Sequence, residues 1–206
     1  MFTPREVDSV KMSIEINQNI QLAIPFFKQT ETGYCHPACV KMVIDFAIDE
    51  LGVKQKRLSL RKIADALQTH KYGGTVRNNI ELINSLLADS VPQIRFQSQV
   101  LARFDDIKKE IDEGRPVIAW IDIAPSDEDI LKHAVIVKCY DLQKGEIKFV
   151  DPEMTLENHV KTMKLGVFVD EKLGVEGRIT KLIISPIGQK NLIGRIKPYE
   201  RRRKTE

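Results

Sequence analysis

The chain has 206 residues, a mass of 23.5 kDa and a formal net charge of +3 at pH 7. Folding at this mass buries roughly 70% of the surface that the unfolded chain exposes, so one globular core needs no disulfide or metal to support it. Hydrophobic residues make up 42% and charged residues 30% of the chain, which excludes a disordered or collagen-like protein. No apolar run approaches the ~18–20 residues of a membrane span, and the polar N-terminus lacks a signal-peptide layout. Three cysteines are too few for a disulfide framework, which favours a cytoplasmic location.

The positive charge is concentrated at the C-terminal end. Residues 195–206 contain six Lys or Arg and two Glu, so this segment carries +4 and residues 1–194 carry −1. Proteins that bind nucleic acids usually spread positive charge over a folded face. We therefore expect a single domain over residues 1–194 that binds neither nucleic acid nor membrane, followed by a basic tail over 195–206 whose role the sequence leaves open.

Helical patterns dominate the first half of the chain. The spacing of Val40, Val43, Ile44, Ala47, Ile48 and Leu51 predicts a helix over 37–51 with one buried face, with Pro37 in its first turn and Gly52 at its end. Ser59 and Thr75 can cap two further helices. The complete set of expected helices is 37–51, 60–68, 76–88 and 104–113.

Strand patterns dominate the second half. Segments rich in β-branched and aromatic residues predict strands over 116–123, 133–140, 146–151 and 179–185, and a short alternating segment near the N-terminus predicts another over 12–16. Helices followed by strands, without alternation of the two, predict an α+β fold in which a helical half packs on an antiparallel sheet. We expect the active cleft between the two halves.

Cys35 lies at the start of the most clearly patterned helix. The positive end of the helix dipole favours a thiolate there, and a thiolate is the nucleophilic form of cysteine. Gln29 lies six residues upstream, on a loop that could turn its amide toward the sulfur. Together with the backbone N–H of Cys35 it would form a two-donor oxyanion hole. A structural cysteine in a helix cap, beside an ordinary surface glutamine, is the alternative.

His133 is the histidine best placed to act as the base, because it follows a polar loop and opens an apolar strand. The short connection 141–145 predicts a hairpin, and if Tyr140 opposes Ile147, Asp151 lies within a few residues of His133 at the same end of the sheet. Its carboxylate could then orient the His133 ring. Since Asp151 precedes a proline, a plain turn initiator is the alternative role for this residue.

The ordered set Gln29, Cys35, His133 and Asp151 resembles the papain-like cysteine peptidases, and is most similar to the double-glycine-type family that processes bacteriocins (cysteine peptidase family 39). The resemblance covers roughly residues 22–160, and the further segments that support it are 38–43, 80–84, 114–119, 133–137 and 149–152. It implies a papain-like fold and hydrolysis of peptide bonds in a peptide or protein substrate. Cys35 would be the nucleophile, His133 the base, Asp151 the residue that orients the base and Gln29 the oxyanion donor. It implies no cofactor and no metal.

Two features depart from that family. Family members commonly have glycine directly after the nucleophile, whereas this chain has His36, whose ring could narrow the approach or supply a positive charge. Bacteriocin processors usually precede a membrane transporter, and this chain has no such segment. A non-catalytic or acyl-transferring papain-like module that binds a peptide or partner is therefore the alternative function. A zinc site that includes Cys35 and Cys39 is a weaker one, because no second close-spaced cysteine pair exists.

Overall fold

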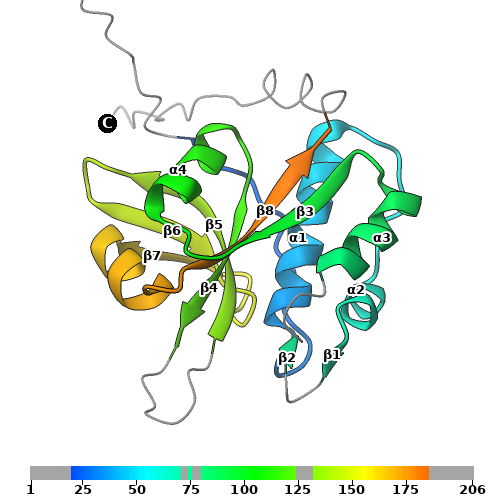
Figure 1. Cartoon of the computed structure of the whole chain (residues 1–206), viewed down its shortest axis with the longest axis horizontal. Coiled ribbons are helices and arrows are strands. Elements are labelled where there is room, and N and C mark those ends of the chain that lie inside the picture. The colour runs from blue at the N-terminus through cyan, green and yellow to red at the C-terminus, as the bar shows by residue number, and fades with distance from the viewer. Residues whose placement is uncertain (1–19, 71–73, 76–79, 124–131, 186–206) are drawn as a thin grey trace, which may run out of the picture.

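The computed structural model describes residues 20–70, 74–75, 80–123 and 132–185. Two expected features lie outside these ranges, the strand over 12–16 and the basic tail over 195–206. Helices occupy the first part of the described chain and an antiparallel sheet the second part, so the predicted α+β fold is confirmed. Figure 1 shows α1, α2 and α3 together on one side of β3 and β8, with α4 and a π-helical segment beside the other strands.

Helix α1 (Cys35–Leu51) begins two residues earlier than the sequence indicates. Pro37 is tolerated at its third position because the first N–H groups of a helix have no intrahelical acceptor. Gly52 ends the helix with φ of +64°, which glycine adopts without steric cost. Every residue of α1 except Asp49 and Glu50 is buried, so the expectation of a single buried face was wrong. A helix buried all round is a central element of the core.

The next helices are α2 (Leu60–Ala66) and α3 (Ile80–Ser90), joined by a two-stranded pair of β1 (Thr69–His70) and β2 (Gly74–Thr75). Ser59 caps α2 as expected, since its hydroxyl accepts from the backbone N–H of Lys62 at 3.3 Å. Helix α2 is shorter than predicted because the chain turns at Gln68, which has φ of +51°. The predicted start of α3 at residues 76–79 lies outside the described residues.

A six-stranded antiparallel sheet forms the second half, with strand order β3-β8-β4-β5-β6-β7. Helix α4 (Phe104–Asp112) lies between β3 and β4 in sequence and packs on β4 and β5. The last strand in the described chain, β8, is inserted between β3 and β4. The strands are β3 (Ile94–Gln99), β4 (Val117–Asp122), β5 (Lys132–Asp141), β6 (Glu146–Val150), β7 (Val160–Lys164) and β8 (Arg178–Ile184).

Strands β3 and β7, which the sequence analysis did not predict, are the two edges of the sheet. β7 has no fully buried residue, and β3 buries only Ile94 and Phe96. Their sequences therefore carry little of the apolar signal by which a strand is recognised. The π-helical segment η1 (Val167–Leu173) also escaped prediction; it buries Phe168 against Phe149.

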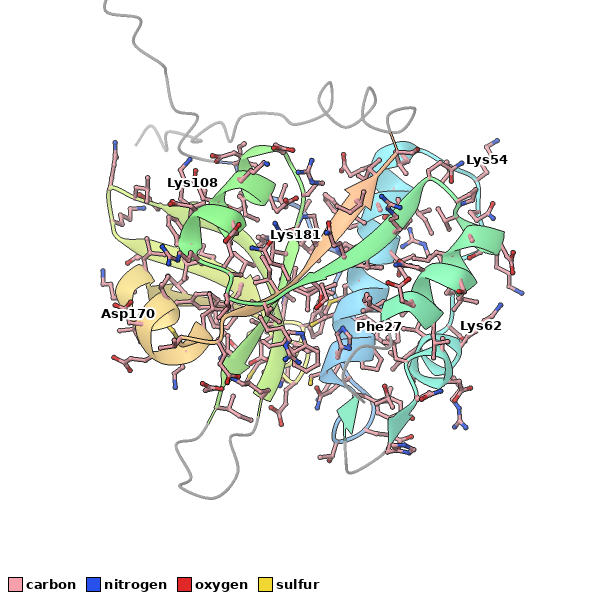
Figure 2. The ribbon with its side chains drawn as sticks, in the orientation of Figure 1. Phe27, Lys54, Lys62, Lys108, Asp170 and Lys181 are labelled. Atoms are coloured by element: carbon pink, nitrogen blue, oxygen red, sulfur yellow. The ribbon has the colours of Figure 1, made fainter. Side chains whose placement is uncertain are left out.

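One cluster of buried apolar residues extends from Leu22 to Ile184 and joins α1 to the sheet. Charged side chains lie around it: Figure 2 places Lys54 and Lys62 at the outside of the helical half and Lys108 and Asp170 at the outside of the sheet half. Among the described helices, none is long and apolar enough to cross a membrane.

Candidate active site

Cys35 is the first residue of α1 and is 9% exposed. The residue before it, Tyr34, occupies the N-cap position without a capping hydrogen bond from its side chain. Helix geometry leaves the N–H groups of the first turn without intrahelical acceptors, so the start of α1 is a region of positive potential. The sulfur of Cys35 is therefore attached at the end of the helix that stabilises a negative charge.

His133 is the second residue of β5, where it pairs with Ile121 of β4. Asp151 directly follows β6, and the predicted pairing of Tyr140 with Ile147 is present. A β-bulge between Val137 and Cys139 then shifts the pairing by one residue. These registers bring His133 and Asp151 to the same end of the sheet.

The His133 ring and the Asp151 carboxylate form a direct hydrogen bond. The Nε2–H of His133 donates to Oδ1 of Asp151 at 2.8 Å, and both side chains are buried. The same Oδ1 accepts from the backbone N–H of Glu153 at 3.0 Å. Asp151 is therefore both the start of a turn and the partner of His133, so the two roles that the sequence left as alternatives coexist.

Cys35 is the second residue that acts on His133, because its interactions with the ring favour the protonated form. Burial lowers the pKa of His133, but hydrogen bonds and charge interactions with Asp151 and Cys35 outweigh it and raise that pKa to about 10. Burial raises the pKa of Asp151, but hydrogen bonds from the His133 ring and the backbone N–H of Glu153, together with the charge of His133, outweigh it and lower that pKa. This arrangement favours a protonated His133 ring beside an ionised Asp151 carboxylate at neutral pH.

Gln29 lies on the loop before α1 and is tied to the turn after Asp151. Its backbone N–H donates to the carbonyl of Pro152 at 2.8 Å. Its side-chain Oε1 is buried and has no hydrogen-bond partner among the described residues. On the same loop, the ring of Phe26 stacks on His159 with 4.5 Å between ring centroids. No sequence pattern indicates this contact, because the two residues are 133 positions apart in the chain.

His36 packs on Trp120, with 4.6 Å between ring centroids. Its ring is 5% exposed, and neither ring nitrogen has a hydrogen-bond partner among the described residues. Burial lowers the pKa of His36 to about 3. The ring is therefore neutral near pH 7, and the expectation that it could supply a positive charge was wrong.

The other two cysteines have different surroundings from Cys35. The Cys39 thiol donates to the carbonyl of Ala134 at 3.3 Å and is fully buried. Burial, with the charges of Cys35 and Asp151, raises the pKa of Cys39 well above its usual value. Burial is also the main cause that raises the pKa of Cys139. Both side chains therefore remain protonated thiols at neutral pH.

One group of three potential metal ligands occurs among the described residues: His133, Asp151 and Glu153, whose ligand atoms lie within 4.8 Å of one another. It does not include Cys35 or Cys39, on which the zinc alternative rests. Two of its atoms, Nε2 of His133 and Oδ1 of Asp151, are already hydrogen-bonded to each other. The arrangement therefore fits acid–base chemistry better than metal binding.

Comparison with known proteins places the chain in a family. A proposed C39-like peptidase of Bacillus anthracis, known from its crystal structure, has the same fold, with a TM-score of 0.59 and 14% sequence identity over 80% of this chain and 96% of that chain. No curated protein matches the sequence. The predicted papain-like α+β fold is thus confirmed. The sequence model of the Peptidase_C39 like family matches residues 21–171, and the chain belongs to that family.

Proposed function

We propose that this protein is a cysteine peptidase in which Cys35 attacks the scissile carbonyl and His133 and Asp151 support it. The observation that carries the proposal is the interaction of His133 with both Asp151 and Cys35, which come from separate parts of the chain. A nucleophile, a base and a residue that orients the base are the three groups that covalent acyl transfer requires. Family membership supports the same class of reaction.

In the first half of the reaction, the Cys35 sulfur forms a bond to the carbonyl carbon of the substrate, and the carbonyl oxygen takes the negative charge. The backbone N–H of Cys35 and the side-chain amide of Gln29 would donate hydrogen bonds to this oxyanion. The His133 imidazolium then gives its proton to the amine nitrogen, the C–N bond breaks, and a thioester with Cys35 remains.

In the second half, His133 takes a proton from a water molecule whose oxygen attacks the thioester carbonyl. The C–S bond breaks, the acid product leaves, and the thiolate–imidazolium pair is restored. Asp151 would hold the His133 ring through Nε2, which leaves Nδ1 for these proton transfers. The raised pKa of His133 fits this role because the ring must be protonated before each attack by Cys35.

A papain-like module that only binds a peptide or partner is the second candidate. Two observations favour it: Cys35 is 9% exposed, and His36 stands where the family commonly has glycine. Such a module would keep the fold but show neither turnover nor an activated thiol.

Digestion of a proteome-derived peptide library by the wild type and by Cys35→Ala separates these two functions. Cys139→Ala is the matched control, because it removes a thiol that lies at the other end of β5. We expect the wild type and the control to cleave and Cys35→Ala to be inactive. Mass-spectrometric mapping with iodoacetamide at pH 7 should label Cys35 before Cys39 and Cys139. No cleavage by the wild type, together with equal labelling of all three thiols, would establish the binding module instead.

A further inference from the structure

An oxyanion donor works only if its orientation is fixed before the substrate arrives, because catalysis by such a group depends on preorganisation. No hydrogen bond to Oε1 fixes the orientation of the Gln29 side chain, because this atom accepts none from the described residues. Its orientation must therefore depend on the backbone of its loop and on the groups that hold that loop.

Two contacts join the Gln29 loop to the segment that follows Asp151. The backbone N–H of Gln29 donates to Pro152 at 2.8 Å. Three residues before Gln29, the Phe26 ring lies on the His159 ring, with 4.5 Å between centroids and an interplanar angle of 34°. Phe26 is half-buried and also packs against the main core cluster. The loop is thus held at both ends of the segment 26–29.

His159 is itself fixed relative to the proposed triad. Its Nδ1–H donates to the carbonyl of Leu156 at 2.5 Å, which closes the turn in which it lies. Its backbone carbonyl accepts from the N–H of Asp151 at 2.8 Å. The residue on which Phe26 rests is therefore hydrogen-bonded to the residue that holds His133.

We propose that the Phe26–His159 ring pair is a positioning element that sets the Gln29 amide relative to Cys35 and His133. This inference rests on the proposed function, since it assigns a role only if Gln29 donates to an oxyanion. The rings do not touch the reacting atoms; they act through the Gln29 loop. Loss of either ring would let Gln29 move while leaving the His133–Asp151 hydrogen bond in place.

Kinetics of five variants test the proposal, using the peptide that the wild type cleaves fastest in the library digest. The variants are Phe26→Ala, His159→Ala, His159→Phe, Gln29→Ala and the double variant Phe26→Ala/Gln29→Ala. Phe104→Ala is the matched control: Phe104 is also half-buried and contacts an aromatic ring, that of Tyr140, edge to face at the other end of β5. The rate of iodoacetamide labelling of Cys35 is measured for each, because this substitution reaction forms no oxyanion.

We expect Phe26→Ala and His159→Ala to lower kcat by about 10- to 100-fold, the range that a displacement of about 1 Å produces. His159→Phe, which keeps a ring for Phe26, should restore most of that loss. In Phe26→Ala and His159→Ala, the rate of iodoacetamide labelling at Cys35 should stay within about twofold of the wild type. The control Phe104→Ala should keep kcat within about twofold of the wild type. In the Gln29→Ala background, Phe26→Ala should change kcat by less than about twofold, because the group it positions is gone.

Equal losses of kcat from Phe26→Ala with and without Gln29 would overturn the proposal, because the ring would then act independently of the amide. The same conclusion follows if His159→Phe is as impaired as His159→Ala. If thermal melting shows that Phe26→Ala does not fold, the comparison of His159→Ala with His159→Phe tests the proposal in its place. Failure of the proposed function is distinct, because the wild type would then cleave nothing. Full activity of Gln29→Ala would overturn the positioning role and leave the peptidase function standing.

Discussion

Val150 of β6 pairs with Ile136 of β5. The pairing of Tyr140 with Ile147 near the hairpin, if continued without interruption, would place Val150 opposite Val137 instead. The shift arises because Lys138 has no partner on β6. Asp151, the next residue, is therefore level with Val135 rather than with Ile136. Side chains alternate between the two faces of a strand, so Val135 and His133 lie on one face of the sheet and Ile136 lies on the other. The bulge thus puts the Asp151 carboxylate on the same side of the sheet as the ring that it holds.

Gln29→Ala should lower kcat by on the order of 10²–10³, as for the loss of comparable oxyanion donors. The rate of iodoacetamide labelling at Cys35 should stay close to that of the wild type, since the His133–Asp151 hydrogen bond does not involve Gln29. Steady-state kinetics with one cleaved peptide, alongside labelling rates, make the comparison. A fall in both quantities to the same extent would assign Gln29 to the thiolate rather than to the oxyanion.

Asp151→Asn should keep the His133 ring oriented, because an amide oxygen can still accept from Nε2, but it removes a negative charge. The raised pKa of His133 depends in part on that charge, so the substitution should lower it. We expect the alkaline limb of the profile of kcat/KM against pH to move to lower pH. The loss of kcat should be comparable to that of Gln29→Ala or smaller. An alkaline limb at the wild-type position would show that Asp151 does not set the proton affinity of His133.

The alkaline stability of the protein should depend on His133. Its pKa is about 10 in the folded protein and close to 6.5 when unfolded, so the folded state holds the extra proton between these values. Its contribution to stability is complete below about pH 6.5 and is lost as the pH rises toward 10. Urea unfolding at several pH values should show a steeper decline for the wild type than for His133→Gln. Parallel curves would contradict the raised pKa.

A substitution at the residue after the nucleophile should increase stability. Both ring nitrogens of His36 are buried without hydrogen bonds from the described residues, and a buried unsatisfied polar group costs about 1–3 kcal/mol. His36→Phe keeps an aromatic ring against Trp120 and removes both nitrogens. We expect the free energy of unfolding to rise by about 1 kcal/mol in urea denaturation. A decrease would mean that the nitrogens have partners, such as ordered water, in solution.

The sequence predicted that His133 and Asp151 lie close together, but it did not predict the bulge that sets how they meet. Residue types and order singled out Cys35, His133 and Asp151, because a thiol at a helix start and a histidine at a strand start are local patterns. The bulge at Lys138 has no such local pattern. Lys138 is buried like the residues on either side of it, so neither its burial nor its place in the strand marks it as the unpaired residue. The edge strands β3 and β7 were missed for a related reason, since burial on a single face leaves few apolar residues to recognise.

The insertion of β8 between β3 and β4 has a consequence for the order in which the sheet is completed during synthesis. Until Arg178–Ile184 have left the ribosome, β3 has no neighbour in the sheet and β4 has only β5. Cys35 is made early, whereas β4, the neighbour of the strand that carries His133, gains its second partner only with this late segment. Contacts so distant in sequence form slowly. A nascent chain of this protein would therefore carry the Cys35 thiol well before the sheet beside His133 is complete.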